Sequence, residues 1–236
     1  MGVRPVSEEA TARMREAAGA RGKRLAIWFC LLVLPLGFEA SNLIAGPHAF
    51  YGGDKSRWFA GLDVRLALTA ASLAVILWSL RRSGESLQSI GWPRRLRAWE
   101  IALIVLVLAG ATAAVFYHPP TISPLASKLT ASTPVTLLER GWLLVLAVAE
   151  SLVQELVWRG AMITWLEPRL GTGGAALLSV ASYVFFHPTF GLSWQALRVA
   201  LPVAALYTFL FLWRRSVGPS ALVHFILTAG QLLSPI

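Results

Sequence analysis

Long apolar runs alternate with short polar segments along most of this chain. A helix needs roughly 20 mostly apolar residues to cross a bilayer. The candidate runs cover about residues 25–45, 58–80, 99–117, 137–166, 175–187, 194–213 and 219–233. The pattern therefore predicts an all-α fold, a polytopic transmembrane helical bundle of about seven spans, with no soluble domain and no internal repeat.

The composition agrees with a membrane protein. Hydrophobic residues make up 56% of the 236 residues and charged residues only 14%, whereas a soluble domain normally carries about a quarter. The net charge of +9 does not form one interleaved face, because the basic residues sit at the ends of the apolar runs. We therefore expect contact with anionic lipid and no nucleic-acid partner.

The basic residues also favour one orientation. Lys and Arg are concentrated in the segment 1–24 and in the loop after the second run, and Arg169 and the pair Arg214–Arg215 fall on the same side. This bias predicts a cytoplasmic N-terminus. We expect residues 1–24 to form a polar basic tail and residues 25–236 a single transmembrane domain, whose first run has no convincing signal-peptide cleavage site.

Ionisable residues inside a span are costly and are functional candidates by default. The fourth run contains Glu150, Gln154, Glu155 and Arg159. Glu155 and Arg159 are one helical turn apart, so they share a face and can pair. Glu150 and Gln154 are also one turn apart, on a neighbouring face. For Glu155 and Arg159 alone, a neutralised pair that joins helices is as good an explanation as chemistry.

Two histidines lie in later runs. His187 ends the fifth run, one turn after Tyr183, and His224 lies in the seventh, one turn before Thr228. Each histidine alone is better explained as an interfacial residue or as a helix contact. Together with Glu155, however, they could supply a general base and groups that polarise a carbonyl.

The spacing of these residues resembles that of the CPBP family, which contains CAAX prenyl proteases and bacteriocin-processing or immunity proteins. The family motifs are Glu-Glu-x-x-x-Arg, Phe-x-x-x-His and His-x-x-x-Asn or Asp. They fall in order on residues 154–159, 183–187 and 224–228. The resemblance covers about residues 137–236, which form the predicted protease-like core.

The resemblance implies a metal-independent, glutamate-dependent intramembrane endopeptidase without a cofactor. In that scheme the glutamate at position 154 or 155, with His187, activates water. His224, helped by Thr228, stabilises the oxyanion, and Arg159 orients the glutamates. The implied substrate is a membrane-anchored protein or peptide, including lipidated ones, and the implied location is a bacterial cytoplasmic membrane. Processing of C-terminal sorting signals, as by myxosortase-like enzymes, is a narrower expectation.

Gln154 stands where the family motif has its first glutamate. This departure matters because glutamine cannot act as a general base. Three explanations stay open: Glu155 or Glu150 substitutes for the missing acid, the protein is naturally inactive, or the glutamine was introduced as a knockout. Tyr183 in place of Phe is a mild change, and Thr228 in place of Asn keeps a polar group.

Other classes compete with this interpretation. A zinc protease could use two His and a Glu, although no His-Glu-x-x-His occurs in the chain. A catalytically silent membrane scaffold or immunity protein is favoured by Gln154. Span counting also raises a difficulty, since it places Glu155 near mid-membrane but His187 and His224 toward opposite sides. A compact site therefore requires tilted, broken or displaced helices.

Overall fold

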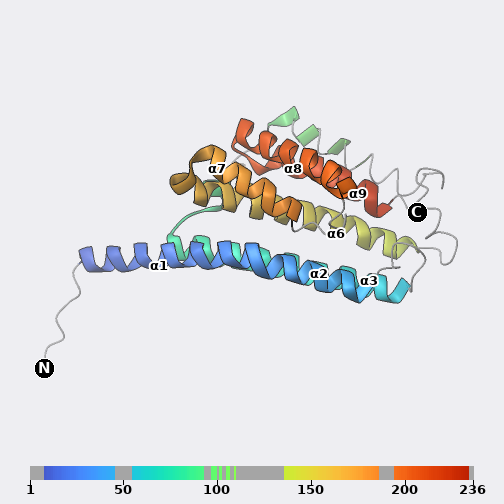
Figure 1. Cartoon of the computed structure of the whole chain (residues 1–236), viewed down its shortest axis with the longest axis horizontal. Coiled ribbons are helices and arrows are strands. Elements are labelled where there is room, and N and C mark those ends of the chain that lie inside the picture. Colours follow the sequence, from blue (N-terminus) through green and yellow to red (C-terminus); the bar gives the residue numbers. More distant parts are fainter. Residues whose placement is uncertain are drawn as a thin grey trace, which may run out of the picture.

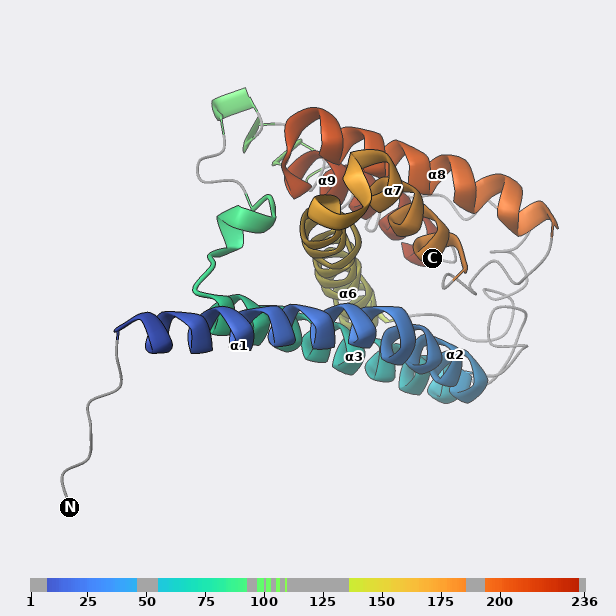
Figure 2. The ribbon, with the colours of Figure 1, turned by 60° about the vertical axis from the view of Figure 1, so that its left-hand side comes forward.

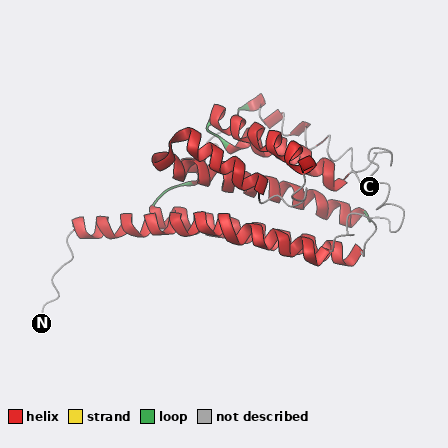
Figure 3. Cartoon of the chain, in the orientation of Figure 1, coloured by secondary structure: helices red, strands yellow, loops and turns green. Residues whose placement is uncertain are grey.

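The structure is a computed structural model in which every described element is a helix (Figure 3). It describes residues 8–45, 55–92, 97–99, 101–102, 105–106, 109, 136–185 and 194–233. The all-helical prediction is confirmed for this part of the chain. Most of the third predicted span and the loop that follows it lie outside the described residues, as does His187.

The first helix is longer than its apolar run. Helix α1 (Glu8–Trp28) continues through a π-helical turn, η1 (Phe29–Val33), into α2 (Leu34–Ala45). Its first 17 residues belong to the predicted polar tail but are rich in Ala, Glu and Arg, which favour helix. Pro35 has no N–H to donate to the preceding turn, and the π-helical turn lies at that point.

Helix α3 (Lys55–Ser83) packs along this first helix, and the two form one layer of the molecule (Figure 1). Close approach depends on glycine, because a Cβ at Gly19 would lie 2.8 Å from the Cα of Ser83. An ion pair joins Lys23 of α1 to Glu85, two residues after the end of α3. A short 3-10 turn, η3 (Leu87–Ile90), follows α3.

The next helical stretch carries the first motif. Helix α6 (Leu137–Glu155) begins at a capping box between Thr136 and Glu139 and passes into a π-helix, η4 (Leu156–Ile163). Helix α7 (Thr164–Phe185) follows, with a break at Gly171, where φ is 67° and ψ is 168°. This positive φ requires a glycine and separates the fourth predicted span from the fifth.

Two further helices complete the described fold. Helix α8 (Trp194–Arg214) and helix α9 (Val217–Leu233) are joined by a tight turn, in which Arg215 has a φ of 48°. Arg215 donates hydrogen bonds to both carboxylate oxygens of Glu167, at 2.7 and 2.8 Å. These bonds raise the pKa of Arg215 and fix the turn against the start of α7.

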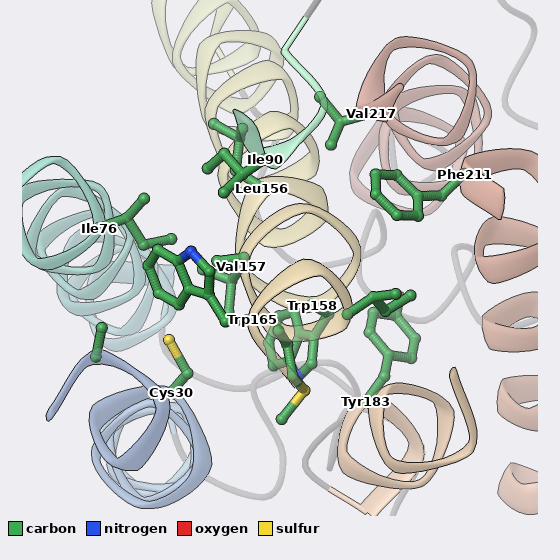
Figure 4. Close-up of a cluster of buried hydrophobic side chains, with 14 of the residues drawn as sticks. Cys30, Ile76, Ile90, Leu156, Val157, Trp158, Trp165, Tyr183, Phe211 and Val217 are labelled. Carbon is green, nitrogen blue, oxygen red and sulfur yellow. The ribbon is translucent and has the colours of Figure 1, made fainter. Parts of the chain in front are cut away.

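Helix α6 lies between the layer formed by α1, α2 and α3 and the group formed by α7, α8 and α9 (Figure 2). The core is continuous across this arrangement. In Figure 4, Leu156 and Val157 of η4 lie between Ile76 of α3 and Phe211 of α8. The stretch that carries the first motif is therefore surrounded by protein.

Two described helical stretches are long and apolar enough to cross a membrane. They are Phe59–Ser83, with 25 residues, and Leu137–Val184, with 48 residues. Shorter apolar helices cover Ala200–Arg214 and Val217–Ala229. Predicted spans two, four, six and seven thus coincide with helices, and the fifth does so as far as residue 185. The number of seven spans and the orientation stay predictions.

Candidate functional site

Glu155 and Arg159 form an ion pair inside the bundle. Glu155 is the last residue of α6, and Arg159 lies in the π-helix η4. Arg159 Nη1 donates to Glu155 Oε1 at 3.0 Å, and both side chains are fully buried. The one-turn spacing therefore produces the expected contact, in a widened helix of the kind that often occurs at functional sites.

His224 of α9 contacts the same carboxylate. Its Nδ1 lies 2.9 Å from Glu155 Oε1, and its side chain is almost fully buried. The residues that span counting placed at different depths thus meet directly. Helix α9 packs along α6, and this packing brings His224 beside Glu155.

Two tyrosines enclose this group. The guanidinium carbon of Arg159 lies 4.4 Å from the ring centroid of Tyr183 and 5.2 Å from that of Tyr207. The ring of Tyr207 is stacked on His224, with centroids 4.8 Å apart and planes at 23°. The Tyr183 hydroxyl is 3.4 Å from His224 Nε2. We call Glu155, Arg159, Tyr183, Tyr207 and His224 the buried polar cluster.

Helix α8 contributes two contacts that the sequence pattern did not predict. Tyr207 supplies its ring, and the backbone carbonyl of Ala204 accepts a hydrogen bond of 3.2 Å from Arg159 Nη2. A tyrosine in an apolar helix was a usable signal for the first. Nothing in a sequence marks a backbone carbonyl, which every residue carries.

The close packing around η4 depends on Gly160. A Cβ there would lie 2.6 Å from the backbone carbonyl oxygen of Ile90 and 3.3 Å from Val217 Cγ1. Residue 160 is next to Arg159 and lies where the turn after α3 and the start of α9 both approach η4. The small residue thus lets the arginine sit at a junction of three segments.

Glu150 has a different partner. Its Oε2 accepts a hydrogen bond of 2.7 Å from Arg65 Nη2 of α3, and Glu150 is 1% exposed. Asp63, on the same helix as Arg65, is exposed. The sequence marks Glu150 as a buried charge but gives no sign of its partner, because Arg65 lies 85 residues away on another helix.

Gln154 is buried, at 4% exposure. Among the described residues, its Oε1 has no hydrogen-bond partner, and neither has Glu155 Oε2 or Glu150 Oε1. Buried polar atoms are normally paired with protein or with water. Three acceptor oxygens on one helix thus point into the interior with capacity for further donors.

Of the remaining predicted site residues, Thr228 is described by the structure and His187 is not. Thr228 lies one turn after His224 and is half-buried, and His187 lies outside the described residues. Within the described part of the chain, no group of three His, Cys, Asp or Glu side chains could hold a metal ion. The zinc alternative requires His187 and stays a prediction.

The described helices thus bury an ion pair and a histidine at the centre of the bundle. Residues 136–230 match the family model described as type II CAAX prenyl endopeptidase Rce1-like. The match confirms the resemblance to CAAX-type membrane proteases over the region that carries the three motifs. No curated protein and no solved structure matched the chain.

Proposed function

We propose that this protein is an intramembrane endopeptidase that cleaves a membrane-associated peptide at the buried polar cluster. The contact that carries the proposal is the link from Arg159 through Glu155 to His224, because it joins the first and third family motifs in the protein interior. The family match over residues 136–230 supports the reaction class.

In this proposal His224 stabilises the oxyanion of the tetrahedral intermediate. Glu155 accepts a hydrogen bond from Nδ1 of His224. The other ring nitrogen of the histidine, Nε2, therefore points away from the carboxylate and toward the Tyr183 hydroxyl. When both ring nitrogens are protonated, Nε2–H is a donor held in a fixed direction. A fixed donor of this kind favours the charge that develops in the transition state.

Glu155 and Arg159 position the histidine. Glu155 Oε1 accepts from both Arg159 and His224, so that oxygen is already engaged. Arg159 is itself held by the Ala204 carbonyl and lies against two tyrosine rings. We therefore assign Glu155 to orientation of His224 and not to activation of water.

The water-activating position is residue 154. Both carboxylates that could replace the missing acid are engaged in ion pairs, Glu155 with Arg159 and Glu150 with Arg65. A glutamine at 154 can accept a hydrogen bond from water but cannot remove its proton. Gln154 therefore limits the rate of this chain, and a glutamate there supplies the base together with His187.

The family points to a membrane-associated, prenylated peptide as the general class of substrate. Peptides with an unmodified transmembrane anchor and a C-terminal sorting signal form a second class. Both would bring a scissile bond to helices that cross the bilayer.

Cleavage assays on three forms of the protein test the proposal. The native chain, a Gln154→Glu variant and a Gln154→Glu/His224→Ala variant are incubated in vesicles with a prenylated C-terminal peptide and with a transmembrane anchor peptide. A general base contributes about 10²–10⁴ in rate, so Gln154→Glu should raise turnover at least a hundredfold, and His224→Ala should remove the gain. A folded Gln154→Glu protein without turnover on either substrate would contradict the proposal.

A second candidate function is a catalytically silent scaffold or immunity protein. The observation that favours it is Gln154 itself, because a glutamine stands where the family motif has a glutamate and cannot remove a proton from water. In that case the native chain and the Gln154→Glu variant would bind the peptides equally and cleave neither.

A further inference from the structure

A pocket of about 930 Å³ lies away from the buried polar cluster, and none of the cluster's residues lines it. It is formed by the middle and second half of α1, the C-terminal end of α3 with the two residues after it, and the segment near Pro168. These three segments are far apart in the sequence and meet at one end of the bundle.

Cations outnumber carboxylates in the lining of this pocket. Two carboxylates, Glu16 and Glu85, contribute to it. The basic residues come from all three segments: Lys23, Arg24, Arg81, Arg82 and Arg169. Five positive charges against two negative charges leave a clear positive excess.

The carboxylates do not cancel this excess. Glu85 already pairs with Lys23 and accepts a hydrogen bond of 3.3 Å from Trp165 Nε1 at the inner wall. Arg24 and Arg169 are exposed, so their guanidinium groups can turn toward a ligand. Arginine donors in a fork geometry suit the oxygens of a phosphate group.

The fold brings these cations together through close helix packing. A Cβ at Gly19 would lie 2.8 Å from Ser83 Cα, and one at Gly22 would lie 3.5 Å from Arg82 Cβ. Because both glycines lie on α1 against the end of α3, the basic residues of the two helices share one opening.

A bilayer that covers the apolar stretch of α3 would have its headgroups at the level of the pocket. Arg81 and Arg82 occupy the last turn of α3, whose apolar stretch ends at Ser83. On α1, Leu25 and Trp28 follow the basic residues directly and are 52% and 59% exposed. A ligand in this pocket would thus have a cationic surface at one end and an apolar surface beside it.

We propose that this pocket binds the phosphate headgroup of an anionic lipid whose acyl chains lie against the apolar part of α1. Basic pockets between membrane helices recognise such headgroups. The bound lipid bridges α1, α3 and the segment near Pro168, and so stabilises the N-terminal layer against the rest of the bundle. The proposal is independent of protease activity.

Lipid retention tests this site. The full chain is purified from mixed vesicles of phosphatidylcholine and phosphatidylglycerol, washed in detergent, and weighed with its bound lipids by native mass spectrometry. The pocket variants are Arg24→Gln and Arg169→Gln. The matched control is Arg21→Gln, an exposed residue of the same helix that does not line the pocket.

We expect retained phosphatidylglycerol in the native chain and in Arg21→Gln, and about fivefold weaker retention in each pocket variant. Thermal unfolding of the delipidated protein separates the sources of phosphate, because phosphatidylglycerol should raise the melting temperature and inorganic phosphate should not. Equal retention in all variants, equal retention of phosphatidylcholine, or full stabilisation by inorganic phosphate alone would each overturn the proposal.

Discussion

Glu155 and His224 are 69 residues apart in the sequence, and 2.9 Å separates the carboxylate Oε1 from the imidazole Nδ1. The contact lies in the protein interior, where Arg159 shares the same oxygen. A charged group in such surroundings requires partners. The three side chains therefore depend on one another, and changes to any of them should act on the others.

Glu155→Gln should strongly destabilise the protein, because it leaves the buried guanidinium of Arg159 without its charge partner. Breaking a buried pair costs about 3–5 kcal/mol, whereas replacing both partners is often close to neutral. The double variant Glu155→Gln/Arg159→Met should therefore recover much of the loss. The free energy of unfolding in mixed micelles titrated with sodium dodecyl sulfate provides the measurement. A double variant as unstable as the sum of the two single ones would show that the pair is not coupled.

The ion pair between Arg65 and Glu150 should hold α3 against α6. We expect Arg65→Met to lower the free energy of unfolding by about 3 kcal/mol, since it leaves Glu150 buried without its cation. Asp63→Asn is the control on the same helix, and at an exposed position it should change stability by less than about 0.5 kcal/mol. If both substitutions had the same small effect, the pair would be dispensable for packing.

Tyr207 should position His224 through its ring and not through its hydroxyl. The stacked ring remains in Tyr207→Phe and is lost in Tyr207→Leu. In the Gln154→Glu background, we expect turnover close to the parent value for the phenylalanine variant and at least a tenfold loss for the leucine variant. The loss should appear in kcat with little change in KM, because the histidine acts in the transition state. Equal losses in both variants would assign the effect to the hydroxyl.

Gly160 should not tolerate a larger residue. In Gly160→Ala the new methyl group would meet the Ile90 carbonyl oxygen at 2.6 Å, and overpacking of this kind costs about 1–3 kcal/mol. At Gly141, the position that a Cβ would take has no neighbouring atom within 4 Å among the described residues, so Gly141→Ala should instead stabilise α6 by up to about 1 kcal/mol. Thermal unfolding of the two variants beside the native chain should show shifts of opposite sign.

The sequence predicted most of the described helices because long apolar runs leave a strong signal in composition. The apolar runs at about residues 58–80, 137–166 and 194–213 coincide with α3, with α6 and η4, and with α8. The beginning of α1 was less visible, since a polar helix with good intrinsic propensity carries no apolar run. Its ion pair from Lys23 to Glu85, just after the end of α3, joins residues that are 62 positions apart.

The candidate site was visible in part for a similar reason. Charged residues inside an apolar run stand out, so Glu150, Glu155 and Arg159 could be selected directly. The one-turn spacing also predicted the pair of Glu155 with Arg159. The spacing carried no information on Arg65, on Tyr207 or on the carbonyl of Ala204, because these partners lie on other helices.

The sequence by itself therefore determined which apolar segments of the described chain are helical and which residues within them carry charge. Helical periodicity assigns a residue to a face of its own helix, but it does not say which helix packs on that face. Only the tertiary structure decided that His224 meets Glu155 and that Glu150 meets Arg65. The physical reason is that a buried charge needs an opposite partner, and the packing of α3 and α9 on α6 selects which partner reaches it.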